Sequence, residues 1–251
     1  MEKISAVIIT YNEEKKIGDC LQSLQGIADE IVVVDSNSTD KTAQIVKSFG
    51  GRFLRHSFEG YIEQKNFALT RAEYNFVLSL DADEILSEPL RESILKVKEK
   101  PEFDGYYMNR MTFLEGKPIK CCGWYPDTKL RLFRRDKGRF TGLNPHDEFR
   151  FTKKTEIGKL NGDLLHYSFD SWEALLKQND KFARISAQSY FNNRRKLSPF
   201  YIWVNPLVRF FRDYFLKGGL KAGKTGLLIS KANAQATFLK YKYIKEIKKK
   251  K

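Results

Sequence analysis

Hydrophobic residues in the first hundred positions gather in short β-branched runs, and segments with helical periodicity separate these runs. Alternation of strand and helix at this spacing is typical of βαβ units and predicts an α/β fold with a mainly parallel sheet flanked by helices. Two runs, IVVV and FVLSL, are apolar without a break, as expected of strands buried on both faces. The predicted strands are Ile4–Ile9, Glu30–Val34, Phe53–Leu54 and Phe76–Leu80, and the predicted helices are Glu13–Leu24, Thr39–Phe49, Ile62–Thr70 and Pro89–Val97.

The pattern changes in the second half of the chain. Asp104–His166 consists of short aromatic and basic segments broken by Gly and Pro, which predicts antiparallel strands and long loops. Helical periodicity then returns. The helices predicted there are Trp172–Phe191, Val204–Lys217 and Gly226–Ile247. We therefore expect one domain over residues 1–197 and a C-terminal amphipathic helical extension over residues 198–251.

The net charge of +14 comes entirely from the end of the chain. Residues 1–193 hold 29 Lys and Arg against 29 Asp and Glu, whereas residues 194–251 hold 16 against two. In Val204–Lys217 apolar side chains fall on one helical face with charged residues opposite, and polar interruptions keep it short of the roughly 20 apolar residues that span a bilayer. An apolar face with cationic flanks is typical of a helix that lies on an anionic membrane surface.

Two other interpretations of this basic extension stay open. The helix pair can pack its apolar face on the domain and leave a solvated basic exterior. Basic and aromatic residues together are also found in RNA-binding proteins. No known RNA-binding motif is present in the sequence, so we expect no nucleic-acid partner.

Length and composition exclude several classes of protein. A chain of 251 residues with 41% hydrophobic residues is neither disordered nor dependent on disulfides. Its three cysteines, two of them adjacent at Cys121 and Cys122, make no disulfide framework and lack zinc-ligand spacing. The first residues, MEKISAVIITYNEE, lack the apolar length and the cleavage site of a signal peptide, so we expect a protein of a reducing compartment.

Polar residues directly follow three of the predicted strands, at the end where open parallel sheets bind ligands. The first strand runs into Thr10–Glu13, the second into Asp35, and the fourth into Asp81 and Asp83. An acidic residue after the second strand commonly accepts hydrogen bonds from a ribose or a base, and no G-x-G-x-x-G is present to bind a dinucleotide. The pattern indicates a nucleotide other than NAD. The alternative role for Asp35 is to form a turn or cap a helix.

Asp81 and Asp83 form a D-x-D pair. Alternate residues of an extended chain point the same way, so the two carboxylates can converge beyond the end of the strand. Such a pair suits a hard divalent cation that also binds phosphate oxygens. The alternative is a solvated acidic turn before the helix at Pro89.

Four segments, VIITYNEE, IVVVDSNSTDKT, QKNFAL and LSLDADE, resemble in order and spacing the family 2 glycosyltransferases of the GT-A fold. The resemblance implies a Rossmann-like sheet, with a nucleotide-sugar half over residues 1–100 and an acceptor half over residues 101–197. It implies that Asp35 binds the nucleoside, Asp81 supports the ribose and Asp83 holds the metal ion. The further residues that it places around the nucleotide are Thr10, Tyr11, Glu13 and Lys65. Lys65 could also oppose the charge of a pyrophosphate on physical grounds, and its alternative is an exposed helix lysine.

Two later segments, GLNPHDEF and LLHYSFDSWEALLKQNDKFA, resemble one branch of that family, the glucosyltransferases of the lipopolysaccharide inner core. That branch has its acceptor-side carboxylate in Gly-x-Val-His-Glu, where this chain has an insertion and the residues PHDE. By resemblance Asp147 is the base that takes the proton of the acceptor hydroxyl and Glu148 is its neighbour, although a slip of one residue exchanges them. His166 joins Asp83 at the metal ion by resemblance, and its alternative is a structural histidine.

The resemblance implies an inverting glycosyltransferase that uses Mg²⁺ or Mn²⁺ and UDP-glucose. The implied acceptor is a lipid-linked saccharide, a heptose of the lipopolysaccharide inner core, and the implied location is peripheral on the cytoplasmic face of the cell membrane. Two alternatives stay open. One is transfer to a polyprenyl phosphate, whose anionic oxygen needs no base, and the other is a non-catalytic basic protein that binds a membrane or RNA.

Gly218–Thr225 matches the phosphate-binding P-loop pattern G-x-x-x-x-G-K-[ST]. That motif requires a buried strand before it and a βαβ domain around it, whereas an aromatic amphipathic segment precedes this one and only 26 residues follow. We therefore expect a glycine-rich turn between two helices.

Overall fold

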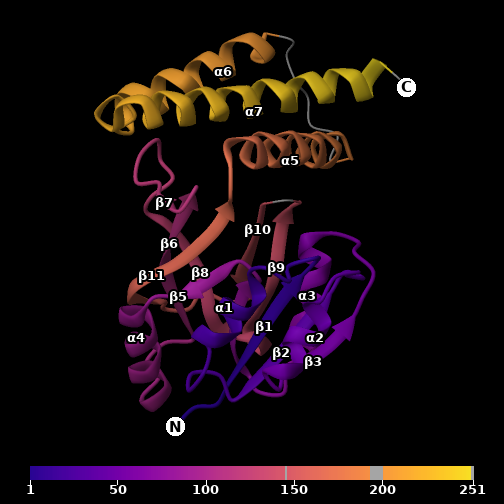
Figure 1. The fold of residues 1–251 in the computed structure, drawn as a ribbon, viewed down its shortest axis with the longest axis vertical. Coiled ribbons are helices and arrows are strands. Elements are labelled where there is room, and N and C mark those ends of the chain that lie inside the picture. Colours follow the sequence, from indigo (N-terminus) through magenta and orange to yellow (C-terminus); the bar gives the residue numbers. More distant parts are fainter. Residues whose placement is uncertain (145, 193–199, 250–251) are drawn as a thin grey trace. The chain divides into compact units, whose positions relative to one another are not determined.

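A computed structural model of the chain describes residues 1–144, 146–192 and 200–249, without the side chains of His146 and Lys249. Strands and helices alternate through the first hundred residues, as predicted (Figure 1). These elements are β1 (Ile4–Thr10), α1 (Ile17–Ser23), β2 (Glu30–Asp35), α2 (Thr42–Ser48), β3 (Arg52–Arg55), α3 (Tyr61–Arg71), β4 (Phe76–Asp81), β5 (Glu84–Leu86) and α4 (Glu88–Glu99). The expected α/β class is confirmed.

The second half of the chain adds strands to the same sheet. They are β6 (Gly105–Leu114), β7 (Lys117–Pro118), β8 (Asp127–Arg134) and β11 (Gly158–Phe169). Within the described residues the sheet has the order β3-β2-β1-β4-β8-β6-β11-β5, with β7 paired to β6. The first four strands of this order pair in parallel, and β8 joins β4 antiparallel. β9 (Gly138–Leu143) and β10 (His146–Phe151) form a separate two-stranded sheet.

Two helices begin later than the sequence predicts. α1 begins at Ile17 rather than Glu13, and α2 begins at Thr42 rather than Thr39. The residues before each helix use their polar groups in the neighbouring loop instead. The amide of Glu13 donates to Thr42 Oγ1 at 3.0 Å. The amide of Lys41 donates to Glu14 Oε2, also at 3.0 Å. These bonds fix the two loops to each other before either helix starts.

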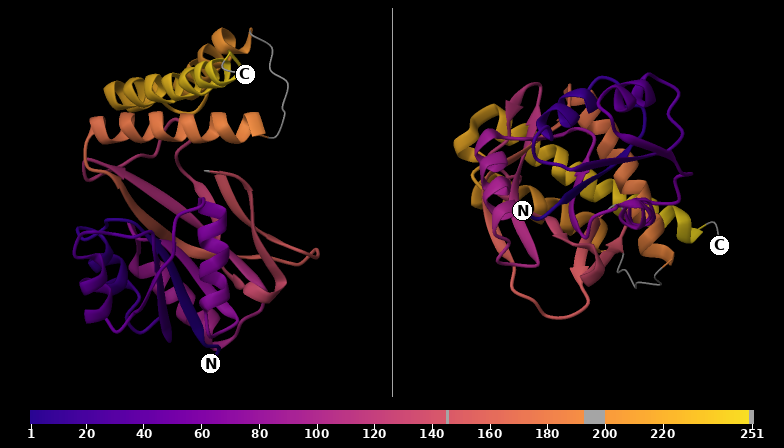
Figure 2. Two further views of the ribbon diagram at one scale, coloured as in Figure 1. Left: turned by 90° about the vertical axis from the view of Figure 1, so that its right-hand side faces the viewer. Right: turned by 90° about the horizontal axis from the view of Figure 1, so that it is seen from below.

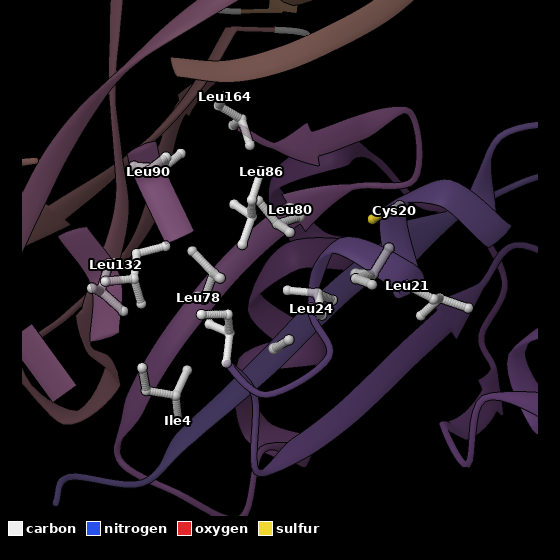
Figure 3. Close-up of a cluster of buried hydrophobic side chains, with 14 of the residues drawn as sticks. Ile4, Cys20, Leu21, Leu24, Leu78, Leu80, Leu86, Leu90, Leu132 and Leu164 are labelled. Carbon is white, nitrogen blue, oxygen red and sulfur yellow. The ribbon is translucent and has the colours of Figure 1, made fainter. Parts of the chain in front are cut away.

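Both faces of the central strands are buried, which explains their unbroken apolar sequences. On β1, Ile4 and Ile8 contribute to one hydrophobic cluster and Val7 to another, because successive side chains of a strand point to opposite faces. Figure 3 shows the first cluster, which includes residues of α1 and α4. The second cluster includes residues of α3 together with Phe133 of β8, Phe140 of β9 and Phe149 of β10.

The chain divides into two compact units. The sheet unit consists of Met1–Arg110, Thr128–Gly142 and Asp147–Tyr167, and the helical unit consists of Met111–Asp127, Leu143–His146 and Ser168–Lys251. The long helix that begins at Trp172 thus belongs with the two C-terminal helices. The domain boundary expected at residue 197 stays a prediction.

The helical unit contains the predicted C-terminal helices. Its elements are α5 (Trp172–Asn192), α6 (Tyr201–Phe211), a π-helical turn (Arg212–Leu216), a 3-10 turn (Leu220–Ala222) and α7 (Gly223–Lys249). α7 contacts both α5 and α6, as Figure 2 shows. Ala183 and Ala187 of α5 are buried in one cluster with Tyr243 and Ile244 of α7. No helix in the described part of the chain combines the length and the apolar character needed to cross a membrane.

Candidate active site

The loops that follow β1 and β2 are bonded to each other through Ser38. Asp35, the last residue of β2, is fully buried, and its carboxylate accepts the Ser38 amide at 2.7 Å and also the Ser38 hydroxyl. The amide of Asn12 donates to Ser38 Oγ at 2.7 Å, and the amide of Thr39 donates to Asn12 Oδ1 at 2.9 Å. The turn-forming role considered for Asp35 is therefore present, and it fixes the shape of this edge of the sheet.

Thr10 and Tyr11 lie at the same edge. Thr10 is paired with Asp35 in the register of β1 and β2. Its hydroxyl is buried, and no group in the described part of the chain hydrogen bonds to it. The side chain of Tyr11 is 58% exposed, and Glu13 is partly exposed in the same loop. Because a buried hydroxyl without a partner is unfavourable, Thr10 Oγ1 is suited to a hydrogen bond from or to a ligand or water.

Asp81, the last residue of β4, lies between two cations. Lys65 Nζ of α3 is 3.1 Å from Asp81 Oδ1, and Arg131 Nη2 of β8 is 2.8 Å from Oδ2. Burial alone would raise the pKa of Asp81, but the charges of Lys65 and Arg131 hold that pKa well below its usual range. Asp81 is therefore an anion at neutral pH, oriented through both of its oxygens.

Arg131 of β8 is a site residue that the motifs in the sequence did not indicate. Its Nη2 also contacts Glu84 Oε1 at 2.6 Å, and Arg110 Nη1 contacts the same oxygen at 3.3 Å. Glu84 is fully buried, and its second oxygen accepts the amide of Asp81 at 2.9 Å. Burial disfavours the charged guanidinium, yet Glu84 and Asp81 raise the pKa of Arg131 above its usual value. The signal in the sequence is a basic residue inside the apolar run Leu130–Phe133, since a cation buried there requires acidic partners.

Lys65 connects Asp81 to Asp147 of β10. Lys65 Nζ donates to Asp147 Oδ2 at 2.9 Å, and Lys65 itself is 4% exposed. The interpretation of Lys65 as an exposed helix lysine is therefore wrong, because its ammonium group is enclosed between two carboxylates. This arrangement brings together residues of three elements, α3, β4 and β10.

Asn66, the residue after Lys65, fixes the strand pair that carries Asp147. Its Nδ2 donates to the carbonyl oxygen of Phe140 at 2.9 Å, and its Oδ1 accepts the amide of Phe140 at 2.9 Å. Glu148, the neighbour of Asp147, is exposed and pairs with Arg150. Of the PHDE segment, Pro145 and the side chain of His146 lie outside the described residues.

Gln64, the residue before Lys65, is also fully buried. Its Nε2 donates to Ser36 Oγ at 3.2 Å, and its Oε1 is 2.8 Å from His56 Nδ1. The His56 ring stacks on Phe67 with a centroid distance of 3.8 Å. Gln64 therefore connects α3 to the loops that follow β2 and β3.

Asp83 and His166 converge beside the carboxyl end of β4. His166 Nε2 of β11 is 3.3 Å from Asp83 Oδ2, and the pairing of His166 with Glu84 in the register of β11 and β5 sets this approach. Burial would raise the pKa of Asp83, but His166 lowers it below the usual value. A carboxylate oxygen and an imidazole nitrogen are both ligands for divalent cations, so the pair fits the expected metal site. Among the described residues no three His, Cys, Asp or Glu side chains gather as a metal site. A cation here would therefore also need oxygen ligands from substrate and water, as Mg²⁺ commonly has.

The segment Gly218–Thr225 lies in the helical unit. It contains the 3-10 turn Leu220–Ala222 and the first residues of α7, and the π-helical turn precedes it. The expected turn between two helices is confirmed, and the described residues directly before it, from Tyr201 to Leu216, are helical rather than the strand that a P-loop needs.

This chain belongs to glycosyltransferase family 2. The model of that family, described as "Glycosyl transferase family 2", matches residues 5–150. The matched range includes every candidate site residue named above except His166. The resemblance noted in the sequence and the identification as a glycosyltransferase are confirmed.

Relatives extend this match to nearly the whole chain. A glycosyltransferase of Rickettsia typhi is 31% identical over 98% of this chain and 88% of its own length. The lipopolysaccharide core biosynthesis glycosyltransferase LpsC of Rhizobium meliloti is 32% identical over 94% of this chain and 89% of its own. The solved structure of the mannosyltransferase PcManGT from Pyrobaculum calidifontis covers 98% of this chain and 88% of its own, with a TM-score of 0.58 and 15% identity. That likeness shows a shared fold, and the expected GT-A type is confirmed.

Proposed function

We propose that this protein is an inverting, metal-dependent glycosyltransferase that transfers glucose from UDP-glucose to a hydroxyl group of a lipopolysaccharide inner-core acceptor. The observation that carries the proposal is the row of contacts from Asp81 through Lys65 to Asp147. It joins a carboxylate at the ligand-binding edge of the sheet to a second carboxylate on β10, so that donor and acceptor groups can meet beside one buried cation.

The nucleotide would bind along the ends of β1, β2 and β4. Asp35 would accept a hydrogen bond from the nucleoside beside Ser38, because a carboxylate oxygen has more than one acceptor position. The unpartnered hydroxyl of Thr10 supports a polar ligand at this edge. Asp81 would support the ribose. The remaining residues proposed to line the nucleotide are Tyr11, Glu13 and Lys65.

Asp83 and His166 would hold Mg²⁺ or Mn²⁺, and such a cation stabilises the negative charge of a departing diphosphate. Asp147 would take the proton of the acceptor hydroxyl as that oxygen attacks the anomeric carbon. Lys65 orients Asp147 through the bond to Oδ2. A single displacement from the face opposite the leaving group inverts the configuration at that carbon.

The relatives support the donor and acceptor classes in this proposal. LpsC is named for lipopolysaccharide core biosynthesis and matches 94% of this chain. PcManGT is named in complex with GDP-Man and Mn²⁺, a nucleotide sugar and a divalent cation. We propose accordingly that the acceptor is a lipid-linked saccharide and that the protein works peripherally on the cytoplasmic, anionic face of the cell membrane.

Isothermal titration calorimetry with four nucleotide sugars tests the donor and the metal ion together. The purified chain is titrated with UDP-glucose, UDP-galactose, UDP-N-acetylglucosamine and GDP-mannose, first with Mn²⁺ and then with EDTA. We expect Mn²⁺-dependent binding of UDP-glucose and a loss of that binding in Asp83→Asn. The exposed residue Asp136 provides the control, because Asp136→Asn should bind as the unchanged protein does. Binding of none of the four sugars would contradict the proposed donor.

A further inference from the structure

Large hydrophobic side chains are exposed on one short segment of the helical unit. Nine of the 13 exposed large hydrophobic residues in the described part of the chain lie between Phe200 and Leu220. The exposed fraction reaches 68% at Trp203 and 81% at Leu216. Single exposed hydrophobic residues are ordinary on a protein surface, but a contiguous group of this kind marks an interaction site.

The exposed residues follow the helical repeat. Trp203, Leu207, Phe211 and Phe215 recur every four positions, so they form one stripe along α6 and the π-helical turn after it. α6 contributes no fully buried residue to the helical unit. It meets α7 instead through partly buried contacts such as that of Asn205 Nδ2 with the Tyr241 hydroxyl at 2.5 Å. The described residues of the helical unit therefore leave this stripe uncovered.

The charge on the same segment is positive. Asp213, its one acidic residue, is fully buried and binds Arg209 Nε at 2.7 Å and Arg212 Nη2 at 2.9 Å. Asn233 of α7 donates to the same carboxylate at 2.7 Å. The exposed charged side chains that follow the stripe are Lys217, Lys221 and Lys224. The negative charge thus lies inside the protein, and only cations accompany the apolar stripe at the surface.

We propose that residues 200–224 form a membrane-docking face that inserts its apolar stripe into the interfacial region of a bilayer and binds anionic headgroups through its lysines. This face would bring the protein to a lipid-linked saccharide. The identity of that acceptor rests on the proposed function. An apolar stripe with cationic flanks and an exposed Trp is the pattern of a helix lying in the membrane interface.

The charge and the aliphatic side chains of residues 200–224 favour a membrane over a second copy of the chain or a nucleic acid. A second copy of the chain packed in parallel on the stripe would bring Lys217, Lys221 and Lys224 against the same lysines, and a copy packed antiparallel would leave these lysines without an acidic partner on the stripe. A nucleic acid would pair with the lysines and stack on aromatic rings, but its phosphates and bases would gain little from contact with the exposed aliphatic residues Leu207 and Leu216.

Vesicle flotation of the full chain tests the docking face. We expect the chain to float with vesicles of equal parts phosphatidylcholine and phosphatidylglycerol, and much less with phosphatidylcholine alone. The double variant Phe211→Ser/Phe215→Ser should lose about tenfold or more of its partition into the mixed vesicles, because each ring is lost from the lipid contact. The variant Lys221→Glu/Lys224→Glu should lose the preference for anionic lipid.

Matched controls come from the same unit. Leu176→Ser on α5 and Lys231→Glu on α7 change exposed residues outside the docking face and should bind vesicles as the unchanged chain does. UDP-glucose binding without vesicles, measured for every variant, reports the proposed function separately. Variants that bind UDP-glucose but not vesicles support the docking face, and a chain that binds vesicles but no nucleotide sugar contradicts only the proposed function.

Three results would overturn the inference. Flotation that Phe211→Ser/Phe215→Ser leaves unchanged would remove the apolar stripe from the contact. A dimer in solution that this variant dissociates, without vesicle binding by the unchanged chain, would assign the stripe to a second copy. RNA binding that depends on Lys221 and Lys224, again without vesicle binding, would assign the segment to nucleic acid.

Discussion

Lys65 neutralises two carboxylates that arrive from different parts of the chain, Asp81 from β4 and Asp147 from β10. Its ammonium group is enclosed, and each of its two acidic neighbours lies within about 3 Å of it, at 3.1 Å for Asp81 and 2.9 Å for Asp147. The same contact places the proposed base next to the proposed ribose-binding residue. In the proposed mechanism, this one side chain therefore aligns the two substrates in addition to neutralising both carboxylates.

Replacing Lys65 with Met is expected to lower the free energy of unfolding by about 1–3 kcal/mol, because it leaves buried carboxylate oxygens without their donor. Donor binding should weaken as well, since Asp81 and Asp147 lose the cation between them. Urea denaturation and calorimetry with UDP-glucose measure the two effects. Lys100, whose side chain is 85% exposed, provides the control: Lys100→Met should leave both unchanged. Equal free energies of unfolding for the two variants would show that the Lys65 contacts make no net contribution to stability.

Asp147 and Glu148 are adjacent, but they have different environments. Asp147→Asn should reduce the rate of transfer to a hydroxyl acceptor by roughly 10²–10⁴-fold, the usual contribution of a general base. Glu148→Gln should change it little, because Glu148 is exposed and paired with Arg150. The measurement is kcat with UDP-glucose and a heptose acceptor. Full activity of Asp147→Asn would favour an anionic acceptor such as a polyprenyl phosphate, which needs no base.

Because the pKa of Asp81 is low in the folded protein, the free energy of unfolding should decrease as the pH becomes acidic. Because the folded protein holds this carboxylate ionised against Lys65 and Arg131, the unfolded chain binds the proton more readily. The stabilisation is complete above the unfolded pKa of about 3.9 and is lost as the pH falls below it. The urea concentration at the midpoint of unfolding should fall as the pH is lowered from neutral to ~3. This decrease should be smaller for Asp81→Asn than for the unchanged chain. An identical slope for both proteins would rule out this contribution.

At the scale of elements, α3 holds the β9–β10 pair through Asn66. Both polar groups of the Phe140 backbone depend on this one side chain. Asn66→Ala should therefore destabilise the protein by about 1–3 kcal/mol, because it leaves an amide and a carbonyl without partners. Thr70→Ala, which removes an exposed hydroxyl bond on the same helix, is the matched control and should have a much smaller effect in urea denaturation. We also expect kcat to fall in Asn66→Ala, since Asp147 is carried by the released pair.

Helices and strands whose hydrophobic pattern lies within one short stretch of sequence were predictable. The strands β1, β2 and β4 have unbroken apolar runs, and the polar residues after them had to meet at one edge because the carboxyl ends of parallel strands lie together. The placement of Asp35, Asp81 and Asp83 follows from that rule. Helix starts were less accurate, because the segments before α1 and α2 are hydrogen bonded to each other, and such contacts between distant segments leave no periodic signal in the sequence.

Contacts between distant segments were not predictable in this way. Lys65 and Asp147 are 82 positions apart, and Arg131 and Glu84 are 47 apart. No periodicity relates such pairs, so the sequence shows a lysine, an arginine and several acids without showing which of them meet. The burial of Arg131 had one local signal, its position inside an apolar strand, but that signal does not show which acidic residues surround it.

At the scale of the whole molecule, the helical unit tests the expected boundary at residue 197. A chain that ends there lacks α7, which covers Ala183 and Ala187 of α5. We expect hydrogen exchange over residues 172–192 to become faster by about tenfold or more in that chain, because α5 loses its buried face. A chain that lacks only residues 248–251 is the control. Unchanged protection of α5 in the chain ending at 197 would support the boundary instead.

Three consecutive residues of α3 face three different neighbours. Gln64 contacts the loop after β2, Lys65 contacts the two carboxylates, and Asn66 contacts β9. Each residue of an α-helix is turned by about 100° from the one before it, so one added residue between Tyr61 and Gln64 would turn all three away from their partners together. A deletion there would do the same. We therefore expect an added residue to be tolerated in the loop before Tyr61, where it does not change which way the helix faces, and not within the helix.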